Sequence, residues 1–391
     1  MEPLPVTSLY LHVPFCAHKC EYCAFYSHAP SGDLVNRYIQ AVIKELELVA
    51  AQVKPRTIFF GGGTPSLLNL QQWGAVLKAM ERLNLLGATE WTVECNPATV
   101  SLDKAKLLRD FGVNRVSMGV QSFDPALLER LGRIHSREMV FKSYDTLRAG
   151  GFSNINLDLM FGIPGQTMKI WHDTLKEAVH LAPEHLSSYE VIYEEDTPLF
   201  QQLQAGEFEV NEELACEMYD ALLHVAGENG YTQYEVANFG SGALNHGVPE
   251  FACKHNLNYW QGGFYVAVGP SACGFEPDGT GNSLGIRTRN WSNTQMYCEL
   301  IEKGTRAIES TERLDNLHRA SEIAAFGLRM NTGWKLGHFT ELTGYNLQQE
   351  WKNEIEDLTS RGWAVLRNDQ FHLTSKGMRF ADAAAELFLR A

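Results

Sequence analysis

The segment Phe15-Cys16-Ala17-His18-Lys19-Cys20-Glu21-Tyr22-Cys23 brings three cysteines together on one short loop. Three thiolates at this spacing can bind three irons of an iron–sulfur cluster and leave one iron open, whereas ferredoxin-type carriers use four thiolates. Enzymes that bind S-adenosylmethionine to a [4Fe–4S] cluster, and cleave it reductively to a carbon radical, use such an open iron. A zinc site is one alternative, but such sites usually add a second Cys or His pair, and none follows at that spacing. Three unrelated buried cysteines are the other alternative.

The length and composition are those of a globular protein with about two domains, or with one large barrel and additions. Of the 391 residues, 45% are hydrophobic and 20% are charged, which is enough to bury a full core. No stretch approaches ~20 uninterrupted apolar residues, so we expect no membrane-spanning segment. Met1-Glu2-Pro3-Leu4-Pro5 lacks the basic and apolar regions of a secretory signal. Eight cysteines then fit a reducing cytosol and a metal role better than disulfides.

The charge balance argues against nucleic acid as a partner. The formal net charge is -14, and the sequence has no block of Lys and Arg and no charged tail. A protein that binds nucleic acid needs positive surface to displace counterions from phosphates. We therefore expect no nucleic-acid partner.

The first half of the chain alternates between β-rich and helical segments, as in a parallel sheet that is either open or closed into a barrel. The six expected strands are Ser8–Phe15, Thr57–Gly63, Glu90–Asn96, Arg115–Ser122, Asn154–Gly162 and His185–Tyr193. Capping residues and glycines mark three helices, which run from Ser101 to Gly112, from Asp124-Pro125 to Gly132, and from Ser136 to Gly150-Gly151.

One face of three neighbouring strands is polar. The residues on this face are Thr92, Glu94 and Asn96 in the third strand, Arg115, Ser117, Gly119 and Gln121 in the fourth, and Asn156 and Asp158 in the fifth. A strand between two helix layers is apolar on both faces, so a barrel with a polar ligand inside explains the pattern better. The alternative is that Glu94 and Asp158 are isolated structural residues.

The unusual residues also fall near the C-terminal ends of their strands, where parallel α/β barrels hold their active sites. The cysteine loop follows the first strand, Gly61-Gly62-Gly63-Thr64-Pro65 ends the second, and Glu94 and Gln121 lie late in the third and fourth. We therefore expect a ligand site at the barrel mouth. The glycines would let a ligand lie against bare backbone, and Glu94 would accept hydrogen bonds from an amine or a ribose hydroxyl.

Three further residues are candidates for binding a second polar molecule at the mouth. Asp158, Gln121 and Arg133 offer a carboxylate, an amide and a guanidinium. Arg133 has an equal alternative as a surface cation at the end of the helix before it.

Four segments carry a resemblance to a known family. They are Tyr10-Leu11-His12-Val13-Pro14-Phe15-Cys16-x3-Cys20-x2-Cys23, Gly61-Gly62-Gly63-Thr64-Pro65-Ser66, Ser117-Met118-Gly119-Val120-Gln121-Ser122-Phe123 and Asp158-Leu159-Met160-Phe161-Gly162-Ile163-Pro164-Gly165-Gln166-Thr167. In collinear order over essentially the whole chain, they resemble the radical S-adenosylmethionine proteins related to oxygen-independent coproporphyrinogen III oxidase. The resemblance implies an α/β fold, a partial (β/α)6 barrel with a C-terminal helical and winged-helix-like extension.

The same resemblance implies roles for individual residues. Cys16, Cys20 and Cys23 would bind the cluster, and Tyr10 would lie beside the methionine-bearing ligand. Gly62 and Glu94 would contact the cluster-bound S-adenosylmethionine. The positions that match a second S-adenosylmethionine site in the oxidase are Gly63, Thr64, Gln121, Arg133 and Asp158.

Two departures from the oxidase argue against oxidation of coproporphyrinogen. The oxidase pattern continues after the third cysteine with one residue and a fourth cysteine, and this chain has Phe25 at that position. The oxidase also has a long N-terminal extension over its active site, whereas fifteen residues precede Cys16 here.

A further segment indicates the haem chaperone branch of the family. Phe251-Ala252-Cys253-Lys254-His255-Asn256-Leu257-Asn258-Tyr259-Trp260 resembles its His-Asn-x-x-Tyr-Trp segment, and Tyr234-Glu235-Val236-Ala237-Asn238-Phe239 also fits that branch. His255 is then a candidate haem-iron ligand, and Tyr259 and Trp260 could pack on a porphyrin face. Cys253 is a competing thiolate ligand. The alternative for His255 is a polar loop histidine beside a buried aromatic pair.

The tail from about Leu314 predicts a small unit with helices around Arg319–Met330 and Leu347–Arg361, followed by a hairpin of Trp363–Leu366 and Phe371–Thr374. It lacks a basic recognition face, so we interpret it as a packing or partner-docking module. The expected domains are the barrel at 1–235, a connecting region with the candidate haem-binding segment at 236–312, and the winged-helix-like domain at 313–391.

Together these features predict a cytoplasmic haem chaperone that binds haem and transfers it to an acceptor haem protein. Its expected cofactors are a [4Fe–4S] cluster, S-adenosylmethionine and haem, and its expected partners include an electron donor for the cluster. A membrane-bound respiratory acceptor would make any membrane association peripheral. The alternative is a radical enzyme that acts through a 5′-deoxyadenosyl radical on coproporphyrinogen III or on another substrate, so the sequence leaves open whether the chain is an enzyme.

Overall fold

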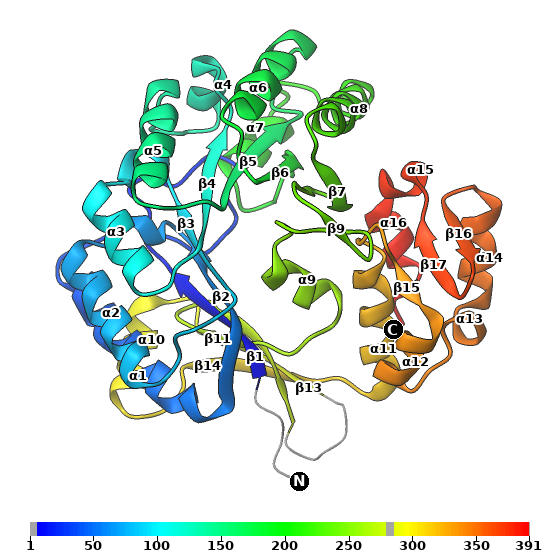
Figure 1. Ribbon diagram of the computed structural model, residues 1–391. Helices are drawn as coiled ribbons and strands as arrows, with labels where there is room; N and C mark the ends of the chain where they lie inside the picture. The colour runs from blue at the N-terminus through cyan, green and yellow to red at the C-terminus, as the bar shows by residue number, and fades with distance from the viewer. Residues whose placement is uncertain (1–5, 279–284, 391) are drawn as a thin grey trace.

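The computed structural model describes residues 6–278 and 285–390. Met1–Pro5, on which the expectation about a secretory signal rests, lie outside them. Six parallel strands lie side by side in chain order (Figure 1). They are β1 (Val6–Val13), β2 (Val53–Gly62), β3 (Glu90–Cys95), β4 (Arg115–Gln121), β5 (Ile155–Phe161) and β6 (His185–Glu190). The predicted strands and the partial (β/α)6 barrel are therefore confirmed.

Helices cover the outer side of these strands (Figure 1). They are α1 (Leu34–Val49), α2 (Leu70–Arg82), α3 (Leu102–Asp110), α4 (Pro125–Arg130), α5 (Arg137–Ala149) and α6 (Met168–His180), with short 3-10 turns at Ala50–Gln52, Pro65–Leu67 and Pro97–Thr99. The predicted capping residues act as expected, because the side chains of Ser101, Asp124 and Ser136 each accept a backbone N–H of the first helical turn.

The sheet continues past the six strands at both edges. β11 (Val266–Val268) pairs in parallel with β1, while β8 (Asn238–Gly240) pairs antiparallel with β6, and β7 (Thr232–Glu235) with β8. Residues of the predicted connecting region thus belong to the barrel sheet, and the division at 235 and 312 stays a prediction. The other elements of this part are α7 (Pro198–Gln204), α8 (Glu212–Glu228), β9 (Leu244–Asn245), β10 (Val248–Pro249), α9 (Lys254–Trp260), β12 (Cys273–Pro277), β13 (Gly285–Asn290), α10 (Thr294–Glu302) and β14 (Ile308–Arg313).

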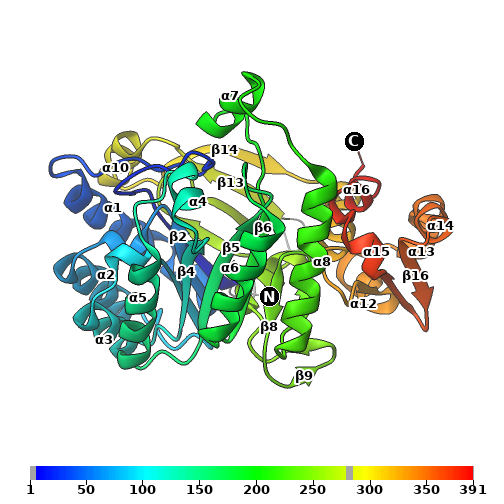
Figure 2. The ribbon, with the colours of Figure 1, turned by 90° about the horizontal axis from the view of Figure 1, so that it is seen from above.

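The C-terminal residues form a separate hydrophobic core that lies opposite α1 to α3 (Figures 1 and 2). Its elements are α11 (Asn316–Gly327), β15 (Trp334–Lys335), α12 (Leu336–Thr343), α13 (Leu347–Glu350), α14 (Lys352–Ser360), β16 (Ala364–Arg367), β17 (Gln370–Leu373), α15 (Ser375–Met378) and α16 (Ala381–Glu386). β16 and β17 pair antiparallel, which confirms the predicted hairpin. The helix predicted over Leu347–Arg361 is instead broken at Trp351, whose buried indole donates to the Phe388 carbonyl at 2.8 Å.

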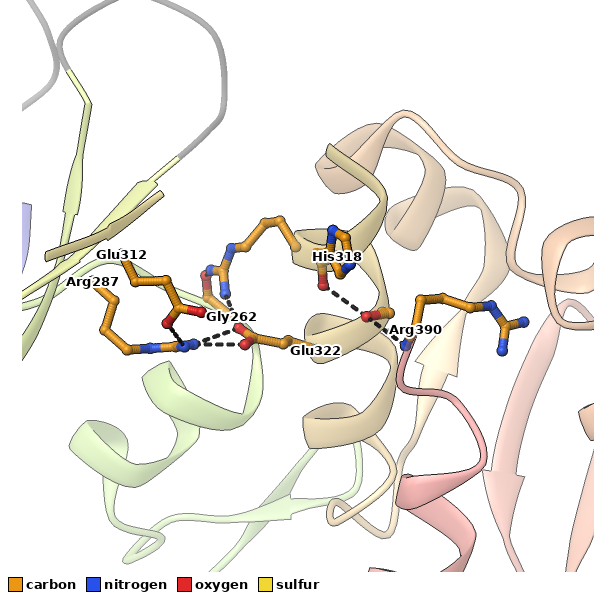
Figure 3. Close-up of polar contacts among 8 residues, drawn as sticks. Gly262, Arg287, Glu312, His318, Glu322 and Arg390 are labelled. Atoms are coloured by element: carbon orange, nitrogen blue, oxygen red, sulfur yellow. Dashed lines mark hydrogen bonds and ion pairs between the residues drawn. The ribbon is translucent and has the colours of Figure 1, made fainter. Parts of the chain in front are cut away.

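A polar cluster joins this C-terminal unit to the barrel (Figure 3). The Arg287 guanidinium on β13 lies 2.6 Å from Glu312 and 2.7 Å from Glu322, which belongs to α11. Beside it, the Arg319 side chain donates to the Gly262 carbonyl, and within the C-terminal unit the Arg390 backbone N–H donates to Ser321 at 3.3 Å. In the part of the chain that the structure describes, no helix combines the length and apolar character needed to cross a membrane.

Candidate functional site

Most of the predicted site residues line one cavity at the carboxyl ends of the strands. Its volume is about 480 Å³. The predicted residues that line it are Cys16, Cys20, Cys23, Gly62, Gly63, Thr64, Glu94, Gln121, Arg133 and Asp158. Tyr10 and His255 do not line it. The expectation that the mouth gathers the unusual residues of several strands therefore matches the structure, whereas the ligands that these residues bind stay a prediction.

The cysteine loop is closed at its base and turns its three thiols toward the cavity. The Cys16 N–H donates to the His28 carbonyl at 3.0 Å, and the His28 N–H donates to the Pro14 carbonyl at 2.9 Å. All three thiols are half-buried and free of disulfides, and burial raises the pKa of Cys23. Among the described residues, no three Cys, His, Asp or Glu side chains group closely enough to hold a single metal ion. The thiols thus lie around the cavity wall rather than at one point.

Two neighbouring side chains donate to these thiols. The Thr64 hydroxyl donates to the Cys16 sulfur, and the Arg133 guanidinium donates to the Cys20 sulfur, both at 3.5 Å. Hydrogen bonds and positive charge stabilise thiolates, so these contacts suit sulfur atoms that act as ligands. Arg133 also donates to the Gly119 carbonyl, so it reaches into the mouth and is not the surface cation of the alternative interpretation.

Gly62, which ends β2, and Gly63, which follows it, both have a structural role. The Gly63 N–H donates to the Val13 carbonyl at 2.7 Å, and a Cβ on Gly63 would lie 2.7 Å from the same oxygen. Gly62 has φ +101°, and a Cβ there would collide with the His12 imidazole. The missing side chains therefore let β2 lie against the segment that leads into the cysteine loop, and not only against a ligand as the sequence suggested.

Two carboxyl groups face the cavity with different surroundings. Burial, followed by the nearby Asp158 carboxylate, raises the pKa of Glu94 to about 8, while the Gly62 N–H opposes the shift from 3.2 Å. Burial also raises the pKa of Asp158, but hydrogen bonds from Asn156 and Ser117 and the charge of Arg115 oppose it. At neutral pH Glu94 can thus donate a hydrogen bond, whereas the bonds from Asn156 and Ser117 and the Arg115 charge stabilise the ionised form of Asp158 against the effect of burial.

Gln121 reaches the mouth through an irregular backbone. Its φ is +66°, in the left-handed region that non-glycine residues rarely adopt. It lies where the register between β4 and β5 shifts after Gly119. Such a bulge redirects a side chain at the end of a strand, here to the cavity wall.

Apolar side chains that the sequence analysis did not select form the outer rim of the cavity. They are Phe25, Ile134 and Ile192, which are 69%, 53% and 67% exposed. Soluble proteins rarely gather exposed apolar groups without a binding role. The residue types alone give no signal for this rim, because exposure follows from the assembled loops.

The candidate haem-binding segment lies at the other end of the barrel. The Glu90 carboxylate at the start of β3 accepts the N–H groups of Lys254 and His255, both at 2.9 Å, and so holds the first turn of α9. The His255 ring bonds Thr57 through Nδ1 at 2.9 Å and Tyr259 through Nε2 at 2.7 Å. It is 1% exposed, and burial, followed by the Arg115 charge, lowers its pKa to about 3.

His255 is thus neutral and has both ring nitrogens engaged in this conformation. Cys253 is also fully buried, and burial raises its pKa to about 12. A haem iron could reach either side chain only after α9 moves. Tyr10 lies between the two ends of the barrel, where it contacts His12 at 3.1 Å and stacks on Phe59. Haem ligation by His255, and the place of Tyr10 beside the cofactor, stay predictions.

A parallel partial barrel with a three-cysteine loop at its mouth defines the radical S-adenosylmethionine class of protein. The model of the radical SAM superfamily matches residues 10–178, and the model of the HemN C-terminal domain matches residues 314–380. The chain belongs to the HemW family. It is 33% identical to the haem chaperone HemW of Lactococcus lactis over 98% of this chain and 97% of the relative. It is also 33% identical to the haem chaperone HemW of Bacillus subtilis, over 98% and 99%.

A solved structure of the same fold is that of the coproporphyrinogen III oxidase HemN from Escherichia coli. The TM-score is 0.82 over 98% of this chain and 90% of that chain, at 20% identity. At this identity the likeness shows the fold alone. Membership in the radical SAM superfamily supports a [4Fe–4S] cluster and S-adenosylmethionine as cofactors, and the donor set at the mouth fits them.

Proposed function

We propose that this protein is a haem chaperone, which binds haem and transfers it to an acceptor haem protein. The observation that carries the proposal is the similarity to curated haem chaperones over nearly the whole of both chains. The acceptor belongs to the class of haem proteins, membrane-bound respiratory components included. The chain would act in the cytoplasm, with an electron donor for its cluster as a further partner.

In this proposal Cys16, Cys20 and Cys23 bind the cluster, which supplies an open iron for S-adenosylmethionine and one-electron chemistry. The soft thiol donors and their hydrogen bonds from Thr64 and Arg133 support this assignment.

The remaining cavity residues would bind S-adenosylmethionine. Gly62 and Glu94 would contact the cluster-bound molecule, and Tyr10 would lie beside the methionine-bearing ligand. Gly63, Thr64, Gln121, Arg133 and Asp158 contact a second molecule. The polar wall between Glu94 and Asp158 supports this arrangement, because its carboxyl oxygens can accept from an amine and from ribose hydroxyls, and a protonated Glu94 can also donate.

The apolar rim supports haem at the mouth, because Phe25, Ile134 and Ile192 expose apolar surface around an open cavity. A porphyrin is a flat apolar ligand whose burial on such side chains is favourable. His255 remains the second candidate contact, at the opposite end of the barrel.

The test is a haem titration of the anaerobically reconstituted protein, followed by the Soret band. Saturation at one haem per chain supports the proposal, and binding no stronger than a nonspecific albumin-like background refutes it. Ile192→Asp and His255→Ala then place the site, with Leu244→Asp as the matched control, because Leu244 is 59% exposed on β9 and does not line the mouth. Formation of 5′-deoxyadenosine that depends on coproporphyrinogen III would instead establish the radical-enzyme alternative.

A further inference from the structure

A continuous network of hydrogen bonds runs through the barrel interior from Cys253, the N-cap residue of α9, to the mouth. The Cys253 backbone N–H contacts the Tyr234 hydroxyl at 3.0 Å, which contacts His185 Nε2 at 2.8 Å. His185 Nδ1 contacts Asn156 Oδ1 at 2.6 Å, and the Asn156 amide nitrogen contacts Asp158 Oδ1 at 2.7 Å. The hydrogen-bond network therefore ends on the Asp158 carboxylate, which lines the mouth cavity.

The Asn156 side chain fixes the direction of the bonds, because its carbonyl oxygen can only accept from His185 and its amide group can only donate to Asp158. Because the Tyr234 oxygen accepts from Cys253, its own hydrogen is free to donate to His185 Nε2. His185 then carries its hydrogen on Nδ1 and donates it to the Asn156 carbonyl oxygen. The Asn156 amide group is left to donate to Asp158. The opposite direction would place two acceptors, His185 Nδ1 and Asn156 Oδ1, against each other.

Ser117 adds a second donor to the same carboxylate. Its hydroxyl accepts from the Asn156 amide at 2.7 Å and donates to Asp158 at 3.2 Å. Asp158 therefore receives two hydrogen bonds from the barrel side, which favours its ionised form and leaves acceptor capacity for the cavity side.

The hydrogen-bond network is isolated from water. Tyr234 is 1% exposed, and His185 and Asn156 are fully buried. Burial, followed by the Arg115 charge, lowers the pKa of His185 well below its usual range, so the ring is neutral as the bond directions require. In a dry interior, a fully satisfied polar network fixes side-chain orientation strongly, because any rotation leaves a buried group unpaired.

We infer that Tyr234, His185 and Asn156 are positioning residues for the mouth ligand, which hold the Asp158 carboxylate toward a cationic or hydroxyl-bearing group such as those of S-adenosylmethionine. The inference rests on the cofactor assignment of the proposed function. It adds a mechanical consequence, because the same bonds tie Asp158 to Cys253, the N-cap residue of α9. Binding at the mouth and the ordering of α9 are then linked, and linkage of this kind is reciprocal.

The experiment compares Tyr234→Phe with Tyr231→Phe in the reconstituted full-length protein. Both tyrosines are buried, and the Tyr231 hydroxyl donates to the Pro183 carbonyl at 2.6 Å, outside the network. Each substitution therefore removes one buried hydroxyl. We expect Tyr234→Phe to weaken S-adenosylmethionine binding by between about twofold and tenfold, the range for one hydrogen bond, and Tyr231→Phe to leave it unchanged.

Hydrogen exchange of residues 253–257 gives a second readout that a purely structural role would not move. S-adenosylmethionine should slow their exchange in the wild type and in Tyr231→Phe, but not in Tyr234→Phe. His185→Gln serves as the second variant if Tyr234→Phe does not fold, with the same expectations. Equal affinities in wild type and variants, or exchange at α9 that ignores the ligand, would overturn the inference alone. A wild type that binds no S-adenosylmethionine would overturn it together with the cofactor assignment, while the haem titration tests the chaperone function separately.

Discussion

Glu90 holds the first turn of α9 through charge-assisted hydrogen bonds, so its replacement should destabilise the segment that matches the haem chaperone branch. The carboxylate is 3% exposed and accepts two backbone N–H groups, both at 2.9 Å. A hydrogen bond to a charged group contributes about 1.5–3 kcal/mol. Glu90→Ala leaves both donors buried and unpaired, so we expect the free energy of unfolding to fall by about 3–6 kcal/mol. Glu90→Gln keeps one acceptor oxygen and should lose about half of that.

Urea unfolding followed by tryptophan fluorescence measures these losses, and hydrogen exchange of α9 localises them. Glu138→Gln is the matched control, because Glu138 also lies in the first turn of a helix, α5, but is exposed. Its unfolding midpoint should fall far less than that of Glu90→Ala, because Glu138 is exposed and accepts its hydrogen bonds at the helix start, where water can replace it. The reasoning is refuted if Glu90→Ala keeps the wild-type midpoint, or if its α9 amides exchange no faster than those of Glu138→Gln.

Three further outcomes follow from the site. The folded-state pKa of Glu94, about 8, lies above its usual 4.5. The wild type should therefore lose stability relative to Glu94→Gln as pH rises between these two values, and lose no more above about 8. Measurements of the free energy of unfolding at pH 5.5, 7 and 8.5 would show this trend. Gly62→Ala should lower iron content after reconstitution through its clash with His12, whereas Gly74→Ala, with open space around its Cα, should not. Glu322→Gln should speed proteolysis between β14 and α11 more than Glu312→Gln, because the Glu322 side chain is 17% exposed against 56% for Glu312.

The barrel could be predicted from the sequence because its signals are local. The alternation of polar and apolar residues in β3 to β5 needs no knowledge of the rest of the chain, and the N-cap residues Ser101, Asp124 and Ser136 act within one helical turn. The pairing of β11 with β1 could not be predicted in this way, because Val266 and Leu9 are far apart in the sequence and three residues carry no distinctive pattern.

In the candidate site, too, the features with local sequence signals could be predicted, and those that depend on distant residues could not. The cysteine loop and the mouth residues follow from motif and strand position, whereas the surroundings of each side chain depend on distant partners. His255 illustrates this, since its two nitrogens are engaged by Thr57 from β2 and by Tyr259 from its own helix. The sequence shows a histidine in a motif, and only the packing of α9 against the strands shows that the imidazole is closed to a ligand in this conformation.

The two ends of the barrel therefore have different requirements for haem. The mouth offers exposed apolar side chains and an open cavity without any rearrangement, so haem there would contact the wall that also carries Glu94 and Asp158. Ligation at α9 requires that His255 leave both of its hydrogen bonds, so it requires a movement of the helix that Glu90 and Tyr234 hold. If haem binds at α9, Glu90→Ala and Tyr234→Phe should strengthen binding, because they weaken the closed form. If haem binds at the mouth, the same substitutions should leave haem affinity unchanged or lower it. The sign of one change in affinity thus distinguishes the two placements.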